Sequence, residues 1–289
     1  MTDGLAILNQ FFGSATAFEL SLFLISILTG LLGAILGIGG GIFIVPVLTL
    51  MFGVHIRYAI GASIVSVIAT SCSAASVFLR KGMTNIRLAL VLEIATTLGA
   101  LIGVALSSYV SPRFLFILFS LVLLYSGLLV LKNRVQDIGL TKNDKWAEKL
   151  SLGSSYFDLQ LGQEVKYGVA NFPKAFVFMG FAGVISALLG IGSGVLKVPA
   201  MDAIMKLPIK ISSATSNFMI GVTAAAGASA YFLKGDVIPA IAAPVALGVF
   251  VGSKIGARIM TRLPSSGIRK LFVIVLLLAA VQMLLKAFK

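Results

Sequence analysis

Long uncharged stretches separated by short polar segments dominate the hydrophobic pattern of the chain. Residues 20–54 and 58–79 carry no charged side chain, and neither do residues 175–196 and 211–233. About 20 apolar residues cross the ~30 Å hydrocarbon core of a bilayer as an α-helix. A membrane β-barrel would instead alternate apolar and polar residues over strands of about 10 residues. The pattern therefore predicts an all-α polytopic membrane protein.

Two of these apolar stretches are interrupted by a glycine-rich turn that is followed by a proline. The first reads Gly-Ile-Gly-Gly-Gly over residues 37–41 with Pro46, and the second reads Gly-Ile-Gly-Ser-Gly over residues 190–194 with Pro199. Glycine bends freely, and proline blocks a regular helix. In hydrocarbon, such a break survives only where it is buried in protein or lines a wet cavity. Paired breaks at matching positions of two halves point to the binding site of a transporter.

The two motifs belong to an internal repeat with a constant offset of 153 residues. Ser63 recurs as Ser216, and Thr70 recurs as Thr223. Each half is expected to contain one interrupted or re-entrant segment and three transmembrane helices, which makes eight to ten helical membrane segments in total.

A polar segment separates the two repeats. It divides the chain into an N-terminal membrane repeat at residues 1–132, a linker at residues 133–173 and a C-terminal membrane repeat at residues 174–289. Within the linker, residues 155–167 alternate enough to predict a small β-hairpin.

The length of the interrupted segment sets the topology. A continuous helix over residues 18–53 would be about 54 Å long, which is too long for one crossing. The segment must therefore enter and return, either as a re-entrant hairpin or as two helices. Three further crossings then invert the second repeat relative to the first.

The basic residues agree with inverted repeats. Sixteen Lys and Arg fall on the linker side and five on the other side, whereas parallel repeats would divide them thirteen to eight. Because the positive side is cytoplasmic, the linker is expected in the cytoplasm and both termini outside the plasma membrane.

Composition narrows the function classes. We assign the net charge of +13 to orientation of the loops rather than to nucleic-acid binding. The chain has one cysteine, Cys72, and one histidine, and it has no Walker motif and no carboxylate-rich metal motif. We therefore predict no catalytic set, no cofactor and no metal site, and we do not expect an enzyme.

The chemistry that the residues offer suits an anion. A short helix follows each glycine turn, and the free amides and positive dipole at its start attract negative charge. Hydroxyl groups follow on one face of the next helix, and a lysine follows the second turn. The candidate substrate-binding residues are Gly37, Gly39, Gly40, Gly41, Gly190, Gly192, Ser193, Gly194, Lys197, Ser63, Thr70, Ser216, Asn217 and Thr223.

Each candidate has a purely structural alternative. The glycines could serve close helix packing, and the hydroxyls could serve hydrogen bonds between helices. Lys197 could neutralise an anionic substrate or pair with Asp202, and Glu93 could carry a proton or pair with a basic group.

The double glycine motif, together with Ala-Thr-Ser-Asn-Phe-Met-Ile-Gly-Val-Thr at residues 214–223, resembles the sulfite exporter TauE/SafE family, which is also described as the toluene sulfonate uptake permeases. The resemblance covers about residues 18–288. It implies a plasma-membrane secondary transporter for small sulfur-containing anions, such as sulfite, sulfoacetate or other organosulfonates, that works by alternating access in the lipid bilayer.

The sequence leaves several points open. The coupling ion could be H⁺ or Na⁺, and a homodimer is neither required nor excluded. An anion channel with a fixed pore is the first alternative function. A membrane-embedded enzyme that acts on a sulfur compound is the second.

Overall fold

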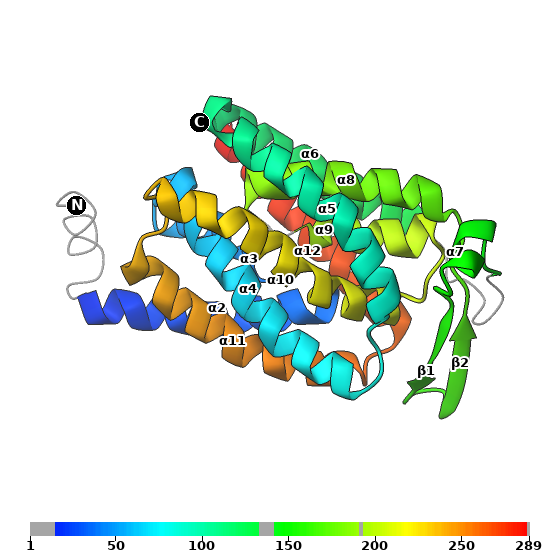
Figure 1. Ribbon diagram of the computed structural model, residues 1–289. Coiled ribbons are helices and arrows are strands. Elements are labelled where there is room, and N and C mark those ends of the chain that lie inside the picture. The colour runs from blue at the N-terminus through cyan, green and yellow to red at the C-terminus, as the bar shows by residue number, and fades with distance from the viewer. Residues whose placement is uncertain (1–14, 133–141, 191–192, 288–289) are drawn as a thin grey trace.

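The computed structural model describes residues 15–132, 142–190 and 193–287, and these residues are almost entirely helical (Figure 1). Helix α10 (Ile209–Leu233) has the same 25-residue length as its equivalent in the first half, helix α4 (Ile56–Arg80). Seven further helices of the described chain are long and apolar enough to cross a membrane: α2 (Ala15–Leu36), α4 (Ile56–Arg80), α5 (Ile86–Leu106), α6 (Pro112–Lys132), α8 (Phe172–Leu189), α11 (Pro239–Met260) and α12 (Ser265–Ala287). The prediction of an all-α polytopic membrane protein is confirmed.

Both glycine turns interrupt helices where the sequence predicts. After the first turn, α3 (Gly41–Pro46) continues into the π-helical turn η1 (Val47–Met51). After the second, α9 (Gly194–Pro199) continues into η3 (Ala200–Ile204). The widened turn begins directly after the proline in each copy, because proline has no amide hydrogen and its ring crowds the preceding turn.

Each interrupted segment returns to the side from which it started. The rings of Phe18 and Phe52 lie 5.3 Å apart, centroid to centroid. In the second half, Asn171 Nδ2 donates to the Ile204 carbonyl at 3.1 Å. The return limb Gly41–Met51 is about 17 Å long, which is too short to cross a membrane as a helix. This geometry favours the re-entrant form over two full crossings.

The repeat is visible in the packing of the helices as well as in their bounds. Helix α2 packs along α11, and their counterparts α8 and α5 pack along one another in the same way. A Cβ atom on Gly252 would collide with the Ile27 carbonyl, and one on Gly99 would collide with the Gly180 carbonyl, which is the equivalent contact. The two halves therefore make equivalent contacts with each other, as an approximate two-fold relation would require.

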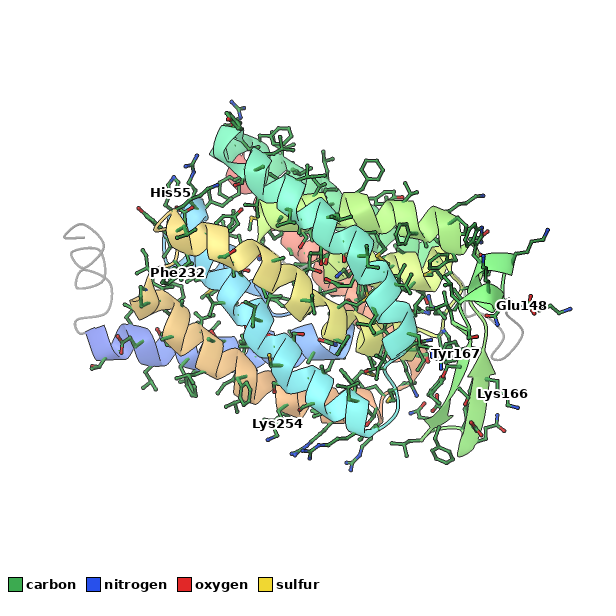
Figure 2. All side chains as sticks on the ribbon, in the orientation of Figure 1. His55, Glu148, Lys166, Tyr167, Phe232 and Lys254 are labelled. Carbon is green, nitrogen blue, oxygen red and sulfur yellow. The ribbon has the colours of Figure 1, made fainter. Side chains whose placement is uncertain are left out.

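The equivalent helices α4 and α10 run in opposite directions. Beyond the end of α4, Asn85 N donates to Thr215 Oγ1 near the start of α10. Near the start of α4, Gly61 packs on the Asp236 carbonyl that follows α10. Figure 2 agrees with this course, since His55, just before α4, and Phe232, near the end of α10, both lie at the left end of the bundle. This course supports inverted repeats, whereas the orientation of each side relative to a membrane stays a prediction.

The two ends of the bundle differ in what covers them. Helix α2 begins and α12 ends at the left of Figure 1, and we call this end the termini side. The linker elements lie at the opposite end, the linker side, and they comprise α7 (Lys145–Lys149), β1 (Ser154–Asp158) and β2 (Gln163–Tyr167). The strands pair antiparallel, which confirms the predicted hairpin.

Close packing of α2 on α11 gives a direct stability test. We expect Gly252→Ala to lower the free energy of unfolding by about 1–3 kcal/mol, because the added methyl group would collide with backbone. Gly127→Ala is the matched control, since its Cβ would meet nothing closer than 3.8 Å. Thermal denaturation of both variants in detergent measures the difference. Equal midpoints for the two variants would contradict the packing described here.

Candidate functional site

The two glycine turns contact each other inside the bundle. A Cβ atom on Gly194 would lie 2.6 Å from the carbonyl oxygen of Gly37, and one on Gly41 would lie 3.2 Å from that of Gly190. Only glycine permits so close an approach of two backbones. The starts of the two return limbs therefore meet in the core of the protein, as a shared site would require.

A pair of reciprocal hydrogen bonds holds the turns in place. Ser63 Oγ on α4 donates to the Gly190 carbonyl at 2.7 Å, and Ser216 Oγ on α10 donates to the Gly37 carbonyl at 2.6 Å. Both serine side chains are fully buried. Each turn is thus bound by the helix of the other half, and these two hydroxyls serve hydrogen bonding between helices.

Helix α10 also satisfies the last carbonyl groups of α2, which have no partner within their own helix. Ser213 Oγ donates to the Leu36 carbonyl at 3.2 Å, and Asn217 Nδ2 donates to the Ala34 carbonyl at 2.9 Å. The Asn217 amide donor is therefore engaged with protein. Its Oδ1 atom is buried and has no hydrogen-bond partner among the described residues.

The two threonines at equivalent positions make different contacts. Thr70 Oγ1 accepts a hydrogen bond from the Gly40 amide at 3.4 Å, so it touches the first turn directly. Thr223 Oγ1 accepts from Lys197 Nζ at 2.6 Å and donates to Glu93 Oε1. Thr70 thus meets backbone, whereas Thr223 belongs to a charged cluster.

This charged cluster joins Glu93 of the first half to Lys197 of the second, and the repeat does not reproduce it. Lys197 Nζ lies 2.9 Å from Glu93 Oε2, and the lysine side chain has no exposed surface. At the equivalent positions the chain carries Ile44 and Ala246. A buried ion pair in a membrane protein is costly and usually functional.

The alternative pairing of Lys197 with Asp202 is wrong. Asp202 instead forms a bidentate ion pair with Arg269 at the start of α12, with an Nη1–Oδ2 distance of 2.6 Å. This ion pair links η3 to α12 near the linker side. The partner of Lys197 is Glu93 instead.

The second turn carries an unpaired hydroxyl beside its amide. Ser193 N donates to Ser186 Oγ at 2.5 Å, whereas Ser193 Oγ is buried without a hydrogen-bond partner among the described residues. Gly192 lies outside the described residues. The position of Ser193 directly before α9 puts this hydroxyl at the meeting point of the two turns.

A cavity of about 30 Å³ lies between the second turn and the termini side of the bundle. Its lining includes the exposed cations Arg57 and Lys234, together with Ile60, Leu188, Tyr231 and Asp236. Ile60 also contacts Gly190, where a Cβ atom would collide with it. A single side chain therefore separates this cavity from the turn.

The residues equivalent to this lining pack differently on the linker side. Their side chains are buried, with the exception of Lys81, which is exposed. These equivalents are Ile35, Phe78, Lys81, Met83, Lys210 and Ser213. The two ends therefore differ at two of these positions: Arg57 and Asp236 are at least partly exposed, whereas their equivalents Lys210 and Met83 are buried.

Sequence reasoning missed the basic residues at the two ends. Arg57 has Lys210 as its equivalent, and Lys234 has Lys81. The sequence does carry a signal for these residues: a positive charge recurs at both positions of the repeat, whereas most of the neighbouring side chains change.

The buried pair on α5 and α9 can be tested by stability. We expect Glu93→Gln or Lys197→Met alone to cost about 3–5 kcal/mol of unfolding free energy, because each leaves a buried charge without its partner. The double variant should recover much of this loss. Thermal denaturation in detergent measures it, with the exposed Glu164→Gln as the control. Additive losses in the double variant would show that the two groups do not interact.

Comparison with known proteins places the chain in one family. It is 28% identical over 273 residues to a probable membrane transporter protein of Bacillus subtilis (strain 168), YunE, covering 91% of this chain and 96% of that protein. It is 25% identical over 245 residues to a second from the same organism, YdhB, covering 85% and 90%. No solved structure matches. The family model described as Sulfite exporter TauE/SafE matches residues 22–283, and the chain belongs to this family of membrane transporters.

Proposed function

We propose that this protein is a secondary transporter that moves small sulfur-containing anions, such as sulfite, sulfoacetate or another organosulfonate, across the plasma membrane by alternating access. The family description names a sulfite exporter, and both relatives carry the name of a probable membrane transporter. The excess of basic residues on the linker side supports a cytoplasmic linker, with both termini outside.

The observation that carries this proposal is the difference between the two ends of the bundle. Arg57 and Asp236 are accessible at the cavity on the termini side, whereas their equivalents Lys210 and Met83 are buried on the linker side. In transporters built from inverted repeats, alternating access is largely a rocking of one repeat against the other around a fixed site, so that the two ends differ in any one state. A fixed pore would not require this asymmetry between the two halves.

The substrate would bind where the glycine turns meet. The return-limb starts at Gly41 and Gly194 supply amides and positive dipole ends, and the unpaired Ser193 hydroxyl supplies a further donor. Lys197 would supply the full positive charge. The proposed substrate-binding set remains the fourteen residues predicted from the sequence, with Ser63, Ser216 and Asn217 acting through the turns that they hold.

Glu93 supports protons as the coupling ion. In the described structure, its carboxylate neutralises Lys197, so the cluster as a whole offers no net charge to an anion. A proton on Glu93 would remove this neutralisation and leave Lys197 available to the substrate. An anion and a proton would then enter the site together.

Uptake into proteoliposomes tests the proposal. We expect saturable flux of radiolabelled sulfite or organosulfonate, driven by a pH gradient and not by a Na⁺ gradient. The Glu93→Gln/Lys197→Met double variant should lower this flux by at least about tenfold, since 1.4 kcal/mol of lost binding already gives that factor. Gly127→Ala should transport normally.

Three outcomes would speak against the proposal. A protein that moves none of these anions would remove the substrate class. Single-channel currents in planar bilayers would favour a fixed pore, and turnover of a sulfur compound in detergent without vesicles would favour an enzyme.

A further inference from the structure

The linker side of the bundle contains a buried ion pair between the linker hairpin and the membrane helices. Both carboxylate oxygens of Asp158, at the end of β1, lie 2.9 Å from Lys210 Nζ at the start of α10. The two side chains are 4% and 2% exposed. Tyr156 Oη and the Gln160 amide also donate to the carboxylate.

Asp158 is held as an anion in this position. Burial by itself would raise the pKa of its carboxyl group, but the hydrogen bonds from Lys210 and Gln160 keep that pKa below its usual value. The Lys210 ammonium group therefore already has a bound oxyanion, which is part of the chain itself.

The repeat shows what Lys210 corresponds to. Its equivalent, Arg57, lines the cavity on the termini side together with Lys234, whose equivalent is Lys81. Each mouth therefore carries two cations at the same repeat positions. The linker lies between the repeats and has no counterpart on the termini side, so Asp158 is specific to the linker side; the carboxylate at the termini-side cavity is Asp236, whose equivalent is Met83.

The hairpin that carries Asp158 bridges both halves. Asn85, between α4 and α5, donates from Nδ2 to the Leu152 carbonyl and to Tyr167 Oη. Gln160 Nε2 donates to the Arg262 carbonyl, after α11. Figure 2 shows the hairpin lying across the end of the helical bundle, with Lys166 on the side away from the helices. Because the hairpin is hydrogen-bonded to both repeats, it must detach from at least one of them when the repeats move relative to each other.

We propose that Lys210 binds the transported anion at the linker-side mouth, that Asp158 occupies it when no substrate is present, and that the hairpin of residues 154–167 leaves when this mouth opens. The proposal rests on the proposed anion transport. A carboxylate and a sulfur oxyanion both present negative oxygens to an ammonium group. Exchange of one for the other keeps the buried lysine paired, and thereby avoids the large cost of a buried charge without a partner.

Hydrogen exchange tests the release without relying on transport. We expect sodium sulfite, compared with sodium chloride at equal ionic strength, to speed backbone exchange in residues 154–167 of the full-length protein. Asp158→Asn should speed it without any sulfite. Lys210→Met should abolish the response to sulfite, and Lys210→Arg should retain it. An unchanged hairpin in sulfite, with wild-type protein folded, would overturn the proposal.

A reversible cross-link tests the movement. In a Cys72→Ser background, Gln160→Cys and Arg262→Cys join the hairpin to the membrane helices through a short, cleavable thiol-reactive linker. We expect this cross-link to lower anion flux at least tenfold and a reductant to restore it. The control joins Ser155→Cys to Lys166→Cys, which face each other across the hairpin, and should leave flux unchanged.

The two experiments separate this inference from the proposed function. Normal flux through the cross-linked protein would overturn the hairpin movement and leave anion transport standing. Absence of flux in every form, combined with a sulfite response of the hairpin that depends on Lys210, would remove transport and support the anion exchange at Lys210.

Discussion

The fold depends on one constraint: a helix that breaks inside hydrocarbon must find partners for its backbone groups within the protein. Here the partners come from the opposite repeat. Ser63 and Ser216 donate to the carbonyl groups of Gly190 and Gly37, and these bonds are equivalent under the repeat. Neither half could bury its own broken helix alone, because its turn would keep an unpaired carbonyl group at a cost of about 1–3 kcal/mol. Each repeat therefore completes the hydrogen bonding of the other repeat's broken helix.

The charges break this symmetry at two levels. In the core, Glu93 and Lys197 have uncharged equivalents, so only the second turn carries an ion pair. At the two ends of the bundle cations recur at equivalent positions, whereas the carboxylates differ: Asp158 of the linker at one end and Asp236 at the other. In the proposed mechanism, in which one repeat rocks against the other, charges that occur once would bias the movement towards one side and couple it to a proton.

Much of the fold was readable from the sequence, because its signals are local or periodic. The glycine turns predict the two helix breaks, and the alternation in the linker predicts the hairpin. The offset of 153 residues predicts that the elements of one half recur in the other. The partner of Lys197 was not readable, since Glu93 lies 104 positions away and a helix pattern does not say which faces meet. The same limit applies to Asn217. Its residue type suggested a ligand, whereas the structure binds its amide to the end of α2. Whether it also contacts a substrate stays a prediction.

The position of Lys210 explains why a transporter would keep a carboxylate over its own mouth. A buried ammonium group without a partner would destabilise the closed state by several kcal/mol. Removing the lysine would avoid that cost but would leave the mouth without a cation to receive an anion. Asp158 resolves this conflict, because it pairs Lys210 in the closed state and is carried on a hairpin that is separate in sequence from the helices that move. Arg57 has no such need, since it lies exposed at the rim of an open cavity, where water screens its charge. In the proposed mechanism, the difference between a covered lysine and an exposed arginine at equivalent positions follows from which mouth is closed.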